Sequence, residues 1–181
     1  MKEKIFYLFR HGQTDWNLNG IMQGHADIPL NETGKKQAHE LGNQLKNEQL
    51  EVIFTSDLQR ANETAQIVSL YSLVPVHSTH ALREINVGEY QGSPKTEFLK
   101  SSLSQYWYDF DPKYDSIGFI KGETKGQART RIITFIESLL SLNYHRIGIC
   151  SHSVVIQLLL HTLQPESSKA LKNGDYIKLI K

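Results

Sequence analysis

Short, mostly apolar runs alternate with longer amphipathic stretches along the chain. Such runs between polar residues are typical of buried strands, and they predict strands over residues 5–9, 51–55, 74–77, 146–150 and 176–180. Apolar side chains at helical spacing predict helices over residues 33–47, from near residue 57 to beyond Val68, and over residues 124–142 and 153–163. Because strands alternate with helices, we expect an α/β sandwich with a mainly parallel central sheet.

Polar side chains indicate where two of these helices begin. Thr33 is expected to cap the helix over residues 33–47. Ser56 followed by Gln59 resembles a capping box, which predicts that the next helix starts near Asp57.

Two segments lack a regular pattern. Residues 10–31 are polar and contain Gly12, Gly20, Gly24 and Pro29, which predicts a long functional loop. Residues 93–123 are aromatic and irregular, and we expect one or two short helices there that lie over the rest as a lid. The whole chain, residues 1–181, is expected to be a single domain with this insertion.

Composition and charge narrow the classes of function. The chain has 181 residues, 39% of them hydrophobic, and a net charge of +1, which gives no argument for binding nucleic acid or an anionic membrane. A single cysteine, Cys150, excludes a disulfide within the chain and favours a reducing compartment. The apolar run over residues 5–9 is too short for a membrane span or a signal-peptide core. We therefore expect a cytoplasmic protein.

Cationic and imidazole side chains follow several predicted strands. Arg10 and His11 come directly after the first, Arg60 lies in the first helical turn after the second, and Ser151 and His152 follow the strand that ends at Cys150. Ligands of open α/β sheets collect at the carboxyl ends of strands. Arginines bind phosphate oxygens through paired hydrogen bonds, and a helix N-terminus adds amide donors. This placement favours a site for a phosphoryl group.

Other mechanisms for phosphate and ester chemistry do not fit the sequence. A cysteine phosphatase needs an arginine six positions after its cysteine, and Ile156 stands there after Cys150. No Gly-x-Ser-x-Gly elbow frames Ser151 or Ser153, and no phosphate-binding loop of the Gly-x-x-x-x-Gly-Lys type is present. The histidines lack the spacings of common metal sites, and the arginines would repel a cation. We expect no metal site.

The sequence also contains long motifs that resemble those of a known protein family. Residues 8–17, Leu-Phe-Arg-His-Gly-Gln-Thr-Asp-Trp-Asn, resemble the Arg-His-Gly-x-Thr-x-Trp-Asn signature of the histidine phosphatase superfamily, in its phosphoglycerate mutase-like branch. Further segments of the chain resemble this family in order: residues 23–30, 55–65, 82–92 and 151–152. The resemblance covers nearly the whole chain. It implies a phosphoglycerate mutase-like fold and an activity like that of small broad-specificity or alpha-ribazole-type phosphatases.

The resemblance implies roles for particular residues. His11 would attack phosphorus and form a phosphohistidine, while Glu84 would protonate the leaving oxygen and then act as base toward water. Arg10, Arg60 and His152 would hold the phosphoryl oxygens with Asn17. Further substrate or phosphate contacts are expected from Thr14, Gln23, Gly24 and Ser153.

Three positions depart from the common family pattern. Ser153 stands where glycine is frequent, and Tyr90 and Gln91 stand where tryptophan and glutamate are common among the phosphatases. None of the three removes a proposed catalytic group, so activity is expected and the changes bear on the substrate.

Three functions are weighed. The first is a phosphomonoesterase, favoured by the short insertion between Glu84 and His152 and by the phosphatase-like segment over residues 23–27. The second is a 2,3-bisphosphoglycerate-dependent phosphoglycerate mutase, and the third is a phospho-ligand-binding module without turnover. The expected partner is a small phosphorylated substrate, with no nucleic acid or membrane, and a homodimer is a candidate assembly. Tyr106, Trp107 and Tyr108 are candidates for the leaving-group pocket, and His25 for its opposite wall.

Overall fold

The computed structural model describes residues 3–165 and 170–180, so the outermost residues of the predicted domain lie outside the described part. One five-stranded sheet has the order β3-β2-β4-β1-β5. Its strands are β1 (Ile5–Arg10), β2 (Val52–Ser56), β3 (Val76–Thr79), β4 (Arg146–Ser151) and β5 (Tyr176–Ile180). Only the β1–β5 pairing is antiparallel. The predicted mainly parallel sheet is therefore confirmed.

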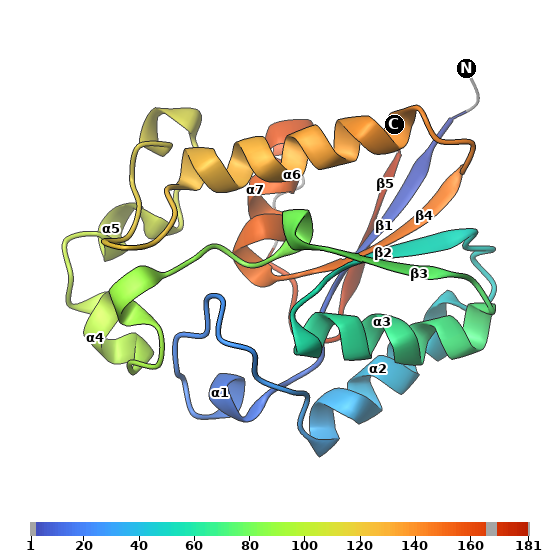
Figure 1. Cartoon of the computed structure of the whole chain (residues 1–181), viewed down its shortest axis with the longest axis horizontal. Coiled ribbons are helices and arrows are strands. Elements are labelled where there is room, and N and C mark those ends of the chain that lie inside the picture. The colour runs from blue at the N-terminus through green and yellow to red at the C-terminus, as the bar shows by residue number, and fades with distance from the viewer. Residues whose placement is uncertain (1–2, 166–169, 181) are drawn as a thin grey trace.

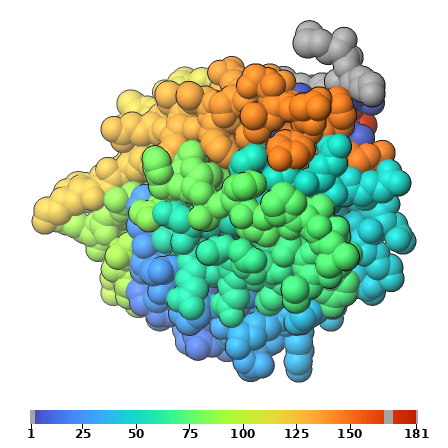
Figure 2. Space-filling model, turned by 45° about the vertical axis from the view of Figure 1, so that its right-hand side comes forward, coloured from blue at the N-terminus to red at the C-terminus, as the bar shows by residue number. Residues whose placement is uncertain are grey.

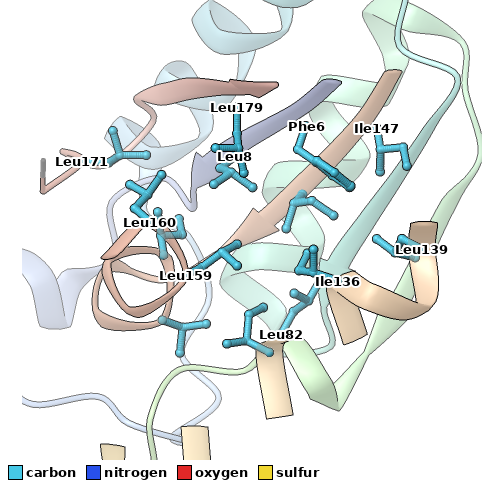
Figure 3. Close-up of a cluster of buried hydrophobic side chains, with 14 of the residues drawn as sticks. Phe6, Leu8, Leu82, Ile136, Leu139, Ile147, Leu159, Leu160, Leu171 and Leu179 are labelled. Carbon is cyan, nitrogen blue, oxygen red and sulfur yellow. The ribbon is translucent and has the colours of Figure 1, made fainter. Parts of the chain in front are cut away.

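Helices cover both faces of this sheet (Figure 1). Helices α2 (Glu32–Leu45) and α3 (Gln59–Ser72) pack on one face, and α6 (Lys125–Leu140) and α7 (Ser153–Leu163) pack on the other. Strand β1 shows why both faces are needed. Phe6 and Leu8 pack toward α6 and α7 (Figure 3), whereas Tyr7 and Phe9 pack toward α2 and α3. Successive side chains of a strand point to opposite faces, so an uninterrupted apolar run requires a three-layer sandwich.

Both predicted helix caps are wrong. Helix α2 is capped by Asn31, whose side chain accepts a hydrogen bond from the Gly34 amide at 2.9 Å, and not by Thr33. Ser56 is the last residue of β2, too early to cap α3, and no cap residue of α3 gives it a side-chain hydrogen bond. Asp27 caps it from a distance instead, because its Oδ1 accepts from the Gln59 amide at 2.6 Å.

Two further boundaries differ from the predictions. The segment 10–31 contains a short helix, α1 (Asp15–Leu18), where only a loop was predicted. Thr14 and Asn17 form its capping box. Strand β3 begins at Val76 instead of residue 74, because its pairing with β2 starts after Pro75, at Ile53 and Val76.

Residues 93–123, the lid segment, connect η2 (Gly88–Tyr90) to α6. The lid segment contains α4 (Lys95–Leu99), α5 (Ser104–Trp107) and the 3-10 turn η3 (Pro112–Tyr114), in agreement with the expected short helices. Two more such turns, η1 (His80–Leu82) and η2, precede it. Phe98, Trp107 and Phe119 of the lid segment build a third apolar cluster, which reaches Val154 and Leu158 on α7. The yellow-to-orange part of the lid segment projects from one side of the molecule (Figure 2).

Two cationic side chains of α6 hold the lid segment in place. Lys125 is fully buried and donates to the carbonyl oxygens of Tyr106 and Asp109. Arg129 pairs with Asp115 at 2.9 Å and donates to the Phe110 carbonyl at 2.7 Å. A buried charge is costly unless it is hydrogen-bonded, so these contacts favour one position of the lid segment.

Within residues 3–165 and 170–180, no helix combines the length and apolar character needed to cross a membrane.

The cap correction at α2 can be tested by two substitutions. Asn31→Ala removes the observed cap and is expected to lower the free energy of unfolding by about 1–2 kcal/mol, whereas Thr33→Ala changes it by less than about 0.5 kcal/mol. Urea unfolding of both variants measures the difference. A larger loss for Thr33→Ala would contradict the assignment.

Candidate active site

The carboxyl ends of β1, β2 and β4 converge on one cavity of about 320 Å³. Strands β1 and β4 are parallel and pair Arg10 with Ser151, so the residues that follow them, His11 and His152, lie side by side. Their ring centroids are 5.0 Å apart. Arg60, in the first turn of α3, reaches the same cavity after the end of β2.

The structure brings most of the residues predicted for the site to this cavity. The cavity wall includes Arg10, His11, Asn17, Gln23, Gly24, Arg60, Glu84 and Ser153. The other two residues are buried beside residues of this wall. His152 lies against His11, and Thr14 lies within 3.1 Å of the side-chain oxygens of Asn17 and Gln23. Thr14 therefore positions wall residues and does not itself line the cavity.

One hydrogen bond defines the tautomer of His11. Its Nδ1 lies 2.7 Å from the Gly12 carbonyl oxygen. Because a carbonyl oxygen only accepts, Nδ1 carries the ring proton and Nε2 keeps a free lone pair. Burial, followed by the charges of Arg60 and Arg10, holds the pKa of His11 well below its ordinary range. The ring is therefore neutral and nucleophilic at Nε2 at neutral pH.

The main chain around His11 is tightly held. The amide of His11 donates to the Ser151 carbonyl at 3.1 Å, and the amide of Gly12 donates to Thr64 Oγ1 at 3.0 Å. A Cβ on Gly12 would come within 2.4 Å of the Gly34 carbonyl oxygen. Only glycine fits at this close approach of two backbones.

Arg60 is fully buried and Arg10 is half-buried, and part of the donor capacity of each is unused. Arg60 donates to the carbonyls of Ala26 at 2.7 Å and Gly24 at 2.8 Å, and Arg10 donates to that of Leu171 at 3.0 Å. The Nε atom of each arginine is buried and has no partner within residues 3–165 and 170–180. Burial lowers the pKa of Arg60 to about 10, which still leaves it charged at neutral pH. Charged donors of this kind favour an anion in the cavity.

His152 is also short of hydrogen-bond partners. Its ring is fully buried, and neither ring nitrogen has a partner within the described part of the chain. Burial, and then the charge of Arg60, lowers its pKa well below the ordinary range. A neutral ring with one free N–H is thus available to a ligand oxygen.

Glu84 supplies the carboxyl group of the cavity. Its two side-chain oxygens accept from the amides of Ile85 at 3.0 Å and Val154 at 3.3 Å. Burial raises its pKa, and it outweighs the opposing effects of these amides and of the arginines. Behind it, His25 Nε2 donates to the Glu84 carbonyl at 2.7 Å. His25 lines a separate hollow with Gln91, so it supports Glu84 from behind and does not form the opposite wall of the substrate cavity.

The three side chains that depart from the family pattern differ in their position relative to the cavity. Ser153 begins α7 and lines the cavity, with its hydroxyl oxygen 3.3 Å from Gln157 Nε2. Tyr90 packs edge-on against Phe98 in the lid cluster. Neither Tyr90 nor Gln91 lines the substrate cavity, so of the three only Ser153 lines it.

The outer part of the cavity contains residues that sequence reasoning missed. Trp107 and Tyr108 line it as expected, whereas Tyr106 stacks on Tyr114 with ring centroids 5.1 Å apart. Lys95 and Gln157 were not predicted. Neither lies next to a motif or a strand end, so no local signal singled them out.

The comparisons with known proteins agree with this geometry. A family model described as the histidine phosphatase superfamily, branch 1, matches residues 6–176. PhoE of Bacillus subtilis, described as an uncharacterized phosphatase, is 43% identical over 93 residues, which cover 51% of this chain and 48% of PhoE. That match thus spans about half the length of PhoE.

Two longer matches extend the comparison. Phosphoglycerate mutase-like protein 4 of Arabidopsis thaliana is 31% identical over 166 residues, 90% of this chain and 72% of that protein. The solved structure of Bacillus stearothermophilus YhfR superposes with a TM-score of 0.85 at 28% identity, covering 97% of this chain and 90% of that one. Because the family model matches almost the entire length of this chain, the chain belongs to the histidine phosphatase superfamily, branch 1.

Proposed function

We propose that this protein is a phosphomonoesterase that hydrolyses small phosphate esters through a phosphohistidine on His11. The observation that carries the proposal is a neutral imidazole with a free Nε2 beside two arginines, each with a buried Nε that has no partner among the described residues. An anion is favoured here, and a nucleophile lies next to it. The phosphatase PhoE among the relatives supports the same reaction.

The first step would transfer the phosphoryl group to the enzyme. Nε2 of His11 attacks phosphorus, the bond to the ester oxygen breaks, and the departing oxygen takes the proton of the Glu84 carboxyl group. Arg10, Arg60 and His152 donate hydrogen bonds to the phosphoryl oxygens, and these bonds stabilise the charge that redistributes over those oxygens in the transition state. The raised pKa of Glu84 supports its role as the acid.

The second step would return the enzyme to its starting state. A water molecule attacks the phosphohistidine, its proton passes to the Glu84 carboxylate, and the P–N bond breaks to release phosphate and neutral His11. The arginines supply the positive charge that this transfer requires. We therefore propose a reaction without a metal ion or cofactor.

One observation favours the mutase as a second candidate. Lys95 adds a cation to the outer wall of the cavity, beyond the two arginines, and lies 5.6 Å from the Tyr108 ring centroid. A cation there suits a leaving group that carries its own negative charge, such as a phosphorylated acid. In a mutase, a hydroxyl of such an acid would take the phosphoryl group back from His11.

The remaining expectations stay predictions. The role of residues 93–123 as a lid, the homodimer and the cytoplasmic location belong to them. The single, fully buried Cys150, whose thiol pKa is raised by burial, supports a location without disulfide chemistry.

The nucleophile is tested by His11→Ala. Phosphate release from p-nitrophenyl phosphate is expected to fall by at least about 10³-fold, and a chelator is expected to leave the unsubstituted enzyme unchanged. His39→Ala is the matched control, because His39 is exposed on α2. Full activity in His11→Ala would overturn the mechanism, and phosphoglycerate interconversion with little free phosphate would select the mutase.

The acid and base roles are tested by Glu84→Gln. Alkyl phosphates need a proton on the leaving oxygen, so their kcat is expected to fall by about 10²–10⁴-fold. p-Nitrophenolate leaves without a proton, so the first step should stay fast while the second step, which needs the Glu84 carboxylate as base, becomes slow. A rapid burst of about one equivalent of p-nitrophenolate per enzyme should therefore precede slow turnover as the phosphohistidine accumulates. Glu89→Gln, at an exposed carboxylate outside the cavity, is the control. Equal steady losses on both substrates without a burst would contradict these roles.

The pKa shifts of Glu84 and His11 predict how activity depends on pH. Because the pKa of Glu84 is raised, its carboxyl group keeps the proton above the ordinary range, and activity on alkyl phosphates is lost as pH rises through that pKa. The lowered pKa of His11 keeps it neutral in mild acid. In Glu84→Gln the decline at high pH should disappear from kcat.

The outer wall is tested by Lys95→Met. The kcat/KM for 3-phosphoglycerate is expected to fall about tenfold, as for one charge-assisted hydrogen bond, with less than about twofold change for p-nitrophenyl phosphate. Lys100→Met, at an exposed lysine just after α4, is the control. An equal fall in kcat/KM for both substrates in Lys95→Met would show that Lys95 does not recognise the leaving group.

A further inference from the structure

The turn before β5 packs against the segment that carries the nucleophile. The main chain of Arg10 accepts from the Gly174 amide at 3.2 Å and donates to the Asp175 carbonyl at 3.1 Å. A side-chain contact adds to these. The Asn173 amide nitrogen, Nδ2, lies 3.0 Å from the His11 carbonyl oxygen and 3.3 Å from that of Gly12. Asn173 thus touches both residues whose mutual hydrogen bond defines the His11 tautomer.

The same nitrogen also reaches the wall of the cavity. Asn173 Nδ2 lies 3.3 Å from Asn17 Oδ1. This oxygen also accepts from the Thr14 amide at 3.1 Å and lies 3.1 Å from Thr14 Oγ1. Donors from two segments therefore surround Asn17 Oδ1. The Asn17 side-chain NH₂ group is left as the donor for the cavity that Asn17 lines.

We propose that Asn173 is a positioning residue for the phosphoryl-binding site, and this inference rests on the proposed function. It does not line the cavity, so it acts on the site through Asn17, while its contacts with the His11 and Gly12 carbonyls hold it in place. Its amide keeps Asn17 turned so that a donor, and not the oxygen, faces a bound anion. A reversed Asn17 would place a partial negative charge against the phosphoryl group, which weakens binding.

The local backbone supports a precise position for Asn173. Gly174 has a φ of +77°, and a Cβ there would come within 2.8 Å of Gln37 Cβ on α2. A glycine is therefore required after Asn173 for the turn to approach α2 this closely. The sequence marks Asn173 and Gly174 only as a turn, because the contact to His11 joins residues 162 positions apart.

The test compares Asn173→Ala and Asn173→Asp with Lys172→Ala, an exposed control in the same turn. The aspartate has the same shape but turns a donor into an anion facing three oxygen atoms. We expect kcat/KM on p-nitrophenyl phosphate to fall about tenfold in Asn173→Ala and further in Asn173→Asp. Lys172→Ala should stay within about twofold of the unsubstituted enzyme.

A double-substitution cycle separates positioning from general damage. If Asn173 acts mainly through Asn17, adding Asn173→Ala to Asn17→Ala should cost less than about twofold more. In proton–nitrogen correlation spectra, the Asn17 side-chain NH₂ signals should shift in Asn173→Ala and stay in place in Lys172→Ala. Independent losses that multiply, or unshifted Asn17 signals, would overturn the proposal.

Two further measurements keep the outcomes distinct. Thermal unfolding midpoints of Asn173→Ala within about 5 °C of the unsubstituted protein would show that the fold is intact. Binding of inorganic phosphate, followed by calorimetry, needs no turnover and should weaken about tenfold in Asn173→Ala. Activity without any effect of Asn173 refutes this inference alone, whereas phosphate binding that depends on Asn173 without turnover refutes only the proposed hydrolysis.

Discussion

Two guanidinium groups, the fully buried one of Arg60 and the half-buried one of Arg10, lie in the site without a carboxylate ion-pair partner among the described residues, and the site depends on this constraint. Within the described residues, the ion pairs do not include Arg10 or Arg60. Carbonyl oxygens satisfy part of their donors, and each Nε stays unpaired. Burial, and after it the charges of these arginines, lowers the pKa of His11 and His152. The same surroundings therefore favour an anionic ligand and keep the His11 ring neutral.

Most of the residues around this charge are held by the main chain. The loop over residues 10–31 supplies carbonyls to Arg60, the cap of α3 through Asp27, and the Gly12 carbonyl to His11. Backbone acceptors hold a cation without neutralising it, as a carboxylate would. This explains why a long polar segment with several glycines adjoins the site and yet has a defined structure.

The lid segment decides what lies beyond the phosphoryl group. Its aromatic side chains mostly pack on each other, and Lys125 donates a hydrogen bond to its main chain at the Asp109 carbonyl. Trp107, Tyr108 and Lys95 still reach the cavity. The proposed phosphoryl site at the end of the sheet is thus combined with an outer wall built from a different part of the chain, and such an arrangement suits discrimination among leaving groups.

The sequence by itself determined the layers, the five strands and the chemical groups at their ends. Apolar runs and long motifs are local signals, and the parallel sheet brings Arg10, His11, Arg60 and His152 together for topological reasons. Weaker local signals failed at α1, at the caps of α2 and α3, and at the start of β3. Only the tertiary structure decided that Asp27 caps α3, that Lys95 lines the cavity and that Asn173 touches His11. These contacts join distant residues, and their existence depends on how whole elements pack, which short-range spacing does not encode.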